Sequence, residues 1–108
     1  MRLESLGEIV AERHLDFNNG DESHHDVVIL MGKPQQFPDA QDYYCPYQIK
    51  GVGTEKIRWS GGIDAFQAIE LALKMIGADL KSLVHRGGHK LSWIADKDGG
   101  LGFPEPPE

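Results

Sequence analysis

Cys45 is the only cysteine in the chain and the first candidate for chemistry, as a nucleophile or a metal ligand. A reactive thiol needs an electropositive, partly exposed setting that lowers its pKa. Cys45 instead alternates with Tyr43, Tyr47 and Ile49 along one stretch, on the face that we expect to be buried. The sequence therefore predicts a core cysteine, and a single thiol fits a reducing compartment such as the cytoplasm.

Five histidines are the next candidates, as metal ligands: His14, His24, His25, His85 and His89. Two glycines separate the last two and disfavour the helix that would bring both onto one face. His24 and His25 stand beside acids in an expected polar loop, and no second cysteine or suitably spaced histidine completes a zinc site. The sequence therefore predicts no metal and no cofactor. A metal-dependent protein using His24, His25 or His85 is a minor alternative.

Gly61 and Gly62 stand before a helix start, as glycines do in loops that bind phosphate. The lysine and the wider glycine spacing of a P-loop are missing. Asp64 would accept hydrogen bonds from the first-turn N–H groups, and its charge would repel a phosphate. The other acids are not paired in a way that would shift a pKa for acid–base catalysis. No catalytic residue is predicted.

Period-two alternation of apolar and polar residues predicts the strands that position these side chains. Glu8–Phe17 alternates, and Asp26–Met31 is apolar on both sides, which is typical of a central strand. Tyr43–Lys50 alternates too, but Pro46 has no N–H to donate and should leave that strand bulged or unpaired. Strands are also expected over Glu55–Ser60 and Lys90–Ala95, and Leu101–Phe103 could add a short final strand.

The period then changes to three and four residues, which predicts one helix from Asp64 to about Val84. Asp64 is a good N-cap, and Gln67 stands three residues later in capping-box position. Gly77 costs about 1 kcal/mol relative to alanine, so a break there is the main alternative. The apolar stripe of this helix comprises Phe66, Ile69, Leu73, Ile76 and Leu80, and it is broadened by Ala65, Ala68 and Ala72.

These elements give the order β-β-β-β-α-β, an α+β fold in which one long helix packs on one face of an antiparallel sheet of about five strands. A chain of 108 residues is long enough for one domain, which we place at residues 1–103. Residues 104–108 are too rich in proline and charge to fold and predict a disordered tail.

The net charge of −6 bears on the partners of the protein, since 17 acids outnumber 11 lysines and arginines. Nucleic-acid binding depends on clustered positive charge, which is missing from this sequence. No apolar run approaches the roughly 20 residues of a membrane span, and charged residues interrupt the N-terminus where a signal peptide would be apolar. We therefore expect a soluble, cytoplasmic protein with no nucleic-acid or membrane partner.

Two sequence blocks resemble those of a known family. The first is YCPYQIKGVG at residues 44–53, and the second is GIDAFQAIELAL at residues 62–73. In this order they resemble the blocks that mark DUF6968, a family of small bacterial proteins of unknown function. The resemblance spans about Met31 to Val84 and implies a bacterial origin and a compact α+β domain. It transfers no catalytic residue.

One helix covers only one face of the predicted sheet, so the other face is left open. Alternation predicts that Ile9, Leu15, Cys45, Tyr47, Ile57 and Trp59 meet the helix. The open face then holds an apolar patch with a polar rim, a pattern that marks partner sites. A homodimer, or cover from the Gly32–Asp42 loop, would explain the patch equally well. The expected partner surface comprises Glu12, His14, Val28, Gln48, Lys50 and Arg58.

The sequence thus favours a non-enzymatic protein-interaction module over an enzyme, with a protein partner or a second copy as its target. One version is an immunity-like protein whose acidity complements a basic toxin. The alternative is a small-ligand-binding or hydrolytic enzyme with a pocket near Cys45, Tyr47 and Trp59.

Overall fold

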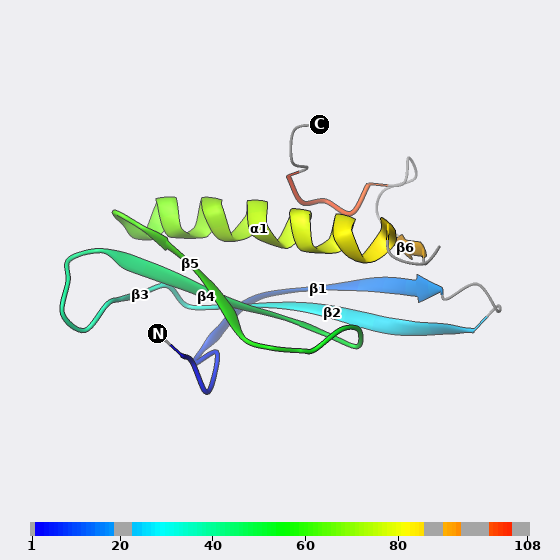
Figure 1. Cartoon of the computed structure of the whole chain (residues 1–108), viewed down its shortest axis with the longest axis horizontal. Coiled ribbons are helices and arrows are strands. Elements are labelled where there is room, and N and C mark those ends of the chain that lie inside the picture. The colour runs from blue at the N-terminus through cyan, green and yellow to red at the C-terminus, as the bar shows by residue number, and fades with distance from the viewer. Residues whose placement is uncertain (1, 19–22, 86–89, 94–99, 105–108) are drawn as a thin grey trace.

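The computed structural model describes residues 2–18, 23–85, 90–93 and 100–104. These residues form an antiparallel sheet with one long helix against one face (Figure 1), so the predicted α+β class is confirmed. The two-residue strand β3 is the one addition to the predicted order. The elements are β1 (Ile9–Asn18), β2 (His24–Gly32), β3 (Gln35–Gln36), β4 (Tyr43–Lys50), β5 (Arg58–Gly62), α1 (Ala65–His85) and β6 (Lys90–Ser92).

Strand β2 lies at the centre of the sheet, whose strand order is β3-β4-β2-β1-β6. Strand β5 pairs along the opposite side of β4, because Tyr47 pairs with Met31 on one side and with Arg58 on the other. Alternate residues of β2 from Val27 to Met31 are buried, and Val28 and Leu30 between them are half-buried. The central position predicted from this doubly apolar run is therefore confirmed.

Pro46 interrupts the ladder on one side of β4 only. On that side the pairing with β3 ends at Tyr44 and the pairing with β2 begins at Tyr47. On the other side Pro46 stands in register opposite Trp59 of β5. The expected gap is thus confirmed on the side of β2 and β3, since proline has no N–H for the ladder.

Strand β5 differs from the prediction in both its bounds and the face it turns to the helix. It begins at Arg58 rather than Glu55, and Ser60 is buried opposite Cys45. Trp59 therefore lies on the other face, where its ring packs 5.5 Å from that of Phe37. Small residues face the helix because α1 begins close by: a Cβ at Gly62 would meet the backbone of Ala68. A tryptophan at this point would hold the helix off the sheet.

The start of α1 follows the prediction. Oδ1 of Asp64 accepts a hydrogen bond from the backbone N–H of Gln67 at 2.8 Å, which satisfies a first-turn donor. The side chain of Gln67 reaches back, and its Oε1 accepts the N–H of Ile63 at 2.8 Å. Asp64 and Gln67 are therefore confirmed as structural caps.

The buried face of α1 lies on the alanine side of the predicted stripe. Its fully buried residues are Ala68, Ala72, Ile76 and Leu80, whereas Ile69 and Leu73 are half-buried. Phe66 is 84% exposed and does not belong to the core. Two alanines at the centre of the contact let the helix backbone approach the sheet closely, which a phenylalanine there would prevent.

Gly77 lies inside an unbroken helix, so the expected continuous helix is confirmed. A Cβ at Gly77 would collide with the carbonyl oxygen of Pro104, which places residues 100–104 against α1. Arg13 of β1 holds the same segment, because its guanidinium donates to the Gly102 carbonyl at 3.0 Å. The guanidinium carbon also lies 3.9 Å from the ring centre of Trp93.

The C-terminal predictions are met in part. The expected strand Lys90–Ala95 is present as β6 up to Ser92, and residues 94–99 lie outside the described residues. The optional final strand over Leu101–Phe103 is not formed, because described residues 100–104 form bends without ladder pairing. Their side chains pack on the helix and on Arg13 instead. Most of the predicted tail, residues 105–108, lies outside the described residues.

The contact of Gly77 with Pro104 leads to a stability prediction. We expect Gly77→Ala to lower the free energy of unfolding by about 1–2 kcal/mol, because an overpacking penalty of about 1–3 kcal/mol exceeds the gain in helix propensity. Urea denaturation measures the change. In a chain that ends at Gly99 the same substitution should instead raise stability by about 1 kcal/mol. An equal loss in both chains would show that Pro104 is not the cause.

Candidate functional site

Cys45 occupies the core, as expected. It is fully buried on the face of β4 that meets α1, and its Sγ donates weakly to the Gly32 carbonyl at 3.8 Å. Burial raises the pKa of the thiol to about 11, so the nucleophilic thiolate is scarce at neutral pH. Cys45 therefore has a packing role in this fold.

The three residues of the predicted pocket do not come together. Tyr47 borders a hollow at the edge of the helix contact, and Cys45 is enclosed in the core. Trp59 lies on the opposite face, in an aromatic cluster with Phe37 and Tyr44. The prediction puts Trp59 on the wrong face, because the actual pairing of β5 with β4 is shifted by one residue from the expected register.

The histidine pair predicted to lie in a loop is part of a strand. His24 and His25 open β2, and their rings engage different partners. The ring of His24 donates through Nδ1 to Asp16 at 2.7 Å. The ring of His25 packs 4.7 Å from that of Phe17 and lies 2.9 Å from the Gly51 carbonyl. His89 and the side chain of His85 lie outside the described residues.

A metal site is not formed by the residues that the structure describes. Within them, no three side chains of histidine, cysteine, aspartate or glutamate are arranged to hold an ion. His14 and His24 are instead bonded to carboxylates, and His25 is bonded to a backbone carbonyl.

Strand register brings most of the predicted partner surface together. His14, Val28 and Lys50 form one row across β1, β2 and β4. Glu12, Leu30 and Gln48 form the neighbouring row. These six residues share the face away from α1 and are called the open patch below. Val28, Leu30 and Gln48 are half-buried, and the other three are exposed.

Arg58 does not belong to this patch, which corrects the prediction. It pairs with Tyr47, a residue of the helix-facing side, and its Nη1 donates to Oδ2 of Asp79 on α1 at 2.6 Å. Strand β5 pairs with β4 one residue away from the predicted register, and a shift of one residue moves every side chain of the strand to the other face. Arg58 therefore joins the helix to the sheet edge.

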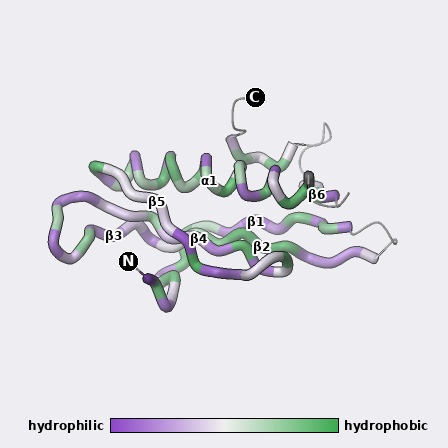
Figure 2. Tube along the Cα trace, viewed as in Figure 1, coloured by the Kyte–Doolittle hydropathy of each residue, from purple (hydrophilic) through white to green (hydrophobic). Residues whose placement is uncertain are grey.

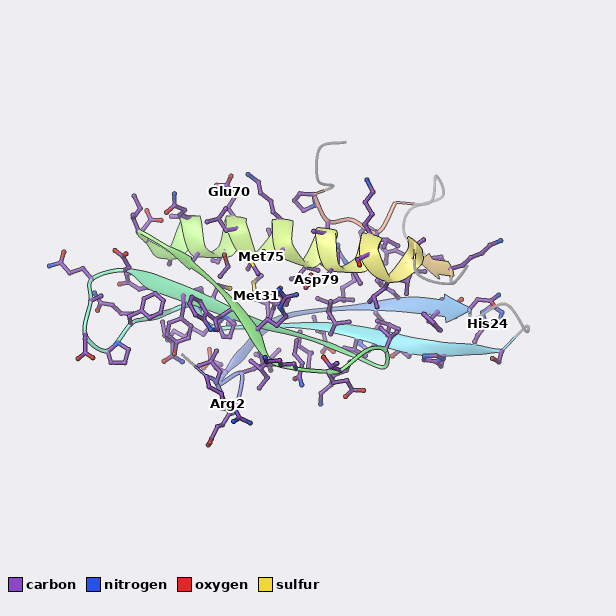
Figure 3. All side chains as sticks on the ribbon, in the orientation of Figure 1. Arg2, His24, Met31, Glu70, Met75 and Asp79 are labelled. Atoms are coloured by element: carbon purple, nitrogen blue, oxygen red, sulfur yellow. The ribbon has the colours of Figure 1, made fainter. Side chains whose placement is uncertain are left out.

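One end of the face that bears the open patch is covered. Phe37, from the loop before β4, packs on Tyr44 and Trp59, so the expected loop cover is present at this end. Leu6 is buried there too, and its carbonyl lies against Gly32. The N-terminal segment runs on this side of the sheet, where Figure 3 labels Arg2. Cover by these segments leaves Glu12, His14 and Lys50 exposed.

The far ends of β1 and β2 carry a group of bonded acids and histidines, and Figure 2 shows the end of β2 as hydrophilic. Asp16 and Asp26 stand directly opposite each other, an arrangement that repels like charges. Each is bonded to a histidine of the other strand: Asp26 to His14 at 2.6 Å, and Asp16 to His24 at 2.7 Å. The two imidazoles therefore offset the repulsion between the strands.

His14 is bonded at both ring nitrogens. Nδ1 lies 2.6 Å from Asp26 and Nε2 lies 3.1 Å from Glu12. Ionised carboxylates can only accept, so both ring nitrogens must donate and the ring must be protonated to make both bonds. The hydrogen bonds to Asp26 and then to Glu12 raise the pKa of His14 above its ordinary value. The open patch thus contains one site whose charge changes with pH.

A further polar group was missed by the sequence reasoning. The Tyr47 hydroxyl donates to Oδ2 of Asp79 at 2.9 Å, the same oxygen that Arg58 reaches. Figure 3 shows Asp79 on the sheet-facing side of α1, with Glu70 on the opposite side. Burial, and then the charge of Asp79, raise the pKa of Tyr47. The available signal was the position of Asp79 between the core residues Ile76 and Leu80.

These features define a small α+β domain in which one helix backs an antiparallel sheet. The sequence profile of DUF6968, described as a domain of unknown function, matches residues 11–105, and the chain belongs to this family. A search of curated proteins and a search of solved structures each return no match. Within the described residues, α1 is the only helix, and it is not long and apolar enough to span a membrane.

Because Cys45 is enclosed in the core, we expect its thiol to be unreactive in the folded protein. We expect its reaction with a disulfide reagent at pH 8 to be at least about a thousandfold slower than in denaturant, because access requires opening of the core. The release of the coloured thiol product gives the rate. Ala78→Cys, on the exposed side of α1, should react rapidly in the same native fold. Comparable native rates for the two thiols would contradict the packing role.

The bonds of His14 predict a pH dependence. Its folded pKa is raised, so its contribution to stability is present below pH 6.5 and is lost as the pH rises through the folded pKa. Asp26→Asn should move the pKa of His14 back toward 6.5, as followed by NMR of the imidazole protons. The matched control Asp39→Asn removes an exposed acid elsewhere and should leave it unchanged. An unmoved His14 in Asp26→Asn would refute the assignment of cause.

Proposed function

We propose that this protein is a non-enzymatic binding module that docks a protein partner on the open patch. The observation that supports this most is the composition of the patch in three dimensions. Val28 and Leu30 form an apolar centre, and Glu12, His14, Gln48 and Lys50 surround it on neighbouring strands. An apolar centre with a polar rim is the usual anatomy of a protein interface.

The charge next to the patch favours a basic partner. Asp16 and Asp26 face each other at one end of the open face, Glu12 lies beyond His14 on the same face, and the whole chain carries a net charge of −6. Such a surface attracts positively charged proteins and speeds their association at low ionic strength. An immunity-like role, in which the module blocks a basic toxin, is one instance of this chemistry. The proposal places the protein in the cytoplasm, which suits its single buried thiol.

A patch of this kind serves binding better than catalysis. The groups at its acidic end are exposed and already bonded to one another, as for His14 with Asp26 and Glu12. Catalytic acids and bases are instead held in enclosed sites where burial changes their pKa strongly.

A second function, small-molecule binding, is favoured by a separate observation on the helix side, the hollow beside Tyr47.

If a partner docks on the open patch, a charge introduced at its apolar centre should weaken the binding. Val28→Glu should reduce the recovery of the specific partner at least tenfold in affinity capture from cells that make the protein, because the carboxylate would be desolvated in the interface. Ala78→Glu, with the same change of charge on the outer side of α1, should recover the partner as wild type does. Circular dichroism and thermal unfolding check that both variants fold.

Light scattering coupled to size exclusion distinguishes a second copy of the chain from an external protein as the partner of the open patch. We expect wild type, Val28→Glu and Ala78→Glu all to be monomers. A wild-type dimer that Val28→Glu converts to a folded monomer would assign the patch to self-association and contradict the external partner. Equal recovery of every captured protein by wild type and Val28→Glu would contradict the role of the patch altogether.

A further inference from the structure

We propose that the hollow beside Tyr47, on the opposite side of the sheet from the open patch, binds a small zwitterion with an apolar side group, such as a free amino acid. The hollow has a volume of about 290 Å³. Its walls come from α1, from the helix-facing side of β4 and β5, and from the turn between these strands. This volume is close to the lower end of the range for small-molecule sites, so it suits a ligand of roughly ten non-hydrogen atoms.

The ion pair between Arg58 and Asp79 in this hollow uses only one oxygen of the carboxylate and one nitrogen of the guanidinium. Arg58 Nη1 and the Tyr47 hydroxyl both donate to Oδ2 of Asp79, at 2.6 Å and 2.9 Å. The second carboxylate oxygen, Oδ1, receives neither bond. Arginine and carboxylate groups commonly pair through two parallel bonds, but Tyr47 holds Oδ2 in a position where Arg58 meets it with one nitrogen. Oδ1 of Asp79 and the remaining N–H groups of Arg58 are the natural docking points for a ligand.

These two docking points have opposite charge. Oδ1 of Asp79 matches an ammonium group, and the remaining N–H groups of Arg58 match a carboxylate. The side chain of Asp79 is 26% exposed, so it is reachable and also partly screened from water, which strengthens its interactions. Lys56 and Glu55 add one further charge of each sign to the wall. A balanced wall favours a ligand with both charges over a simple anion or cation.

The hollow also has an apolar side. Val52 and Leu83 line it and are half-buried. An aliphatic side group placed against them would be removed from water, which is worth about 0.8 kcal/mol per CH₂ group. The polar and apolar walls together describe an amphipathic ligand: two charged groups at one end and a short hydrocarbon group at the other.

The turn that forms one wall is held in place before any ligand arrives. The Gln48 side chain donates to the Glu55 carbonyl at 2.6 Å, and the Gly51 N–H donates to Oε2 of Glu55 at 3.1 Å. Glu55 has φ of 55°, in the left-handed region that non-glycine residues seldom adopt. The turn therefore has a defined shape, and a preformed wall lowers the entropic cost of binding.

The test is an NMR titration of the full-length protein with L-leucine and two analogues. The analogues are 4-methylpentanoate, which lacks the ammonium group, and 3-methylbutylamine, which lacks the carboxylate. We expect L-leucine to shift backbone signals of residues 52–56 and 79–83 with a dissociation constant of about 1 mM or lower, and each analogue to bind at least tenfold more weakly. No protein partner takes part, so the result is independent of the open patch.

Variants separate this site from non-specific binding. Arg58→Gln and Asp79→Asn should each weaken L-leucine at least tenfold, and Asp79→Asn keeps an acceptor for Tyr47. Leu83→Trp should block binding by filling the hollow without touching the ion pair. Lys50→Gln, on the open face, removes the same charge as Arg58→Gln and should bind as wild type does.

Three outcomes would overturn the proposal. The first is the absence of shifts around the hollow at 20 mM L-leucine, which is roughly twentyfold above the expected constant. The second is equal binding of 4-methylpentanoate, which would make this a simple anion site. The third is unchanged binding in the folded Leu83→Trp variant.

Discussion

The close approach of one helix to the sheet is the constraint on which the rest of this structure depends. Ala68 and Ala72 are fully buried at the centre of the contact, and across from the start of the helix the sheet presents Ser60 and Gly62. Small residues on both sides bring the two backbones together. Farther along the same contact Asp79, a short acid on α1, accepts hydrogen bonds from the sheet residues Tyr47 and Arg58. The same contact encloses Cys45 and removes it from chemistry.

A single helix cannot cover both faces of a sheet. On the face away from α1, other segments cover one end, and the surface becomes more polar toward the other end. At one end, Phe37 and Leu6 pack over it, which buries Pro46. Toward the other end, apolar surface is limited to the half-buried Val28 and Leu30, and the strands become polar. Soluble proteins rarely leave a larger apolar surface without a partner. The apolar centre of the open patch is accordingly small, because Val28 and Leu30 are each half-buried.

The sequence predicts most of this fold, and the errors have a common physical cause. Alternation identifies β1 and β4, a run that is apolar on both sides identifies β2, and the cap at Asp64 identifies the start of α1. In β1, β2 and β4 the rule that large apolar residues face the core does hold. The rule fails where the helix and sheet are closest. There the core positions are alanine, serine and glycine, while Phe66 and Trp59 face elsewhere. The Tyr47–Asp79–Arg58 group could not be derived, because it depends on a strand phase and a helix position that local pattern does not define.

The acids on β1 and β2 explain why histidines, rather than lysines, stand among them. Asp16 faces Asp26 across the ladder, so the strands need positive charge at this end. A lysine would supply it at every physiological pH and would leave the surface close to neutral. His14 supplies it, because its hydrogen bonds to Asp26 and then to Glu12 raise its pKa and keep the ring charged beyond the range of an isolated histidine. Loss of the His14 proton makes the same face more acidic and weakens the link between the strands. As the pH rises through the folded pKa of His14, the negative charge of this face therefore grows while the contribution of His14 to fold stability is lost.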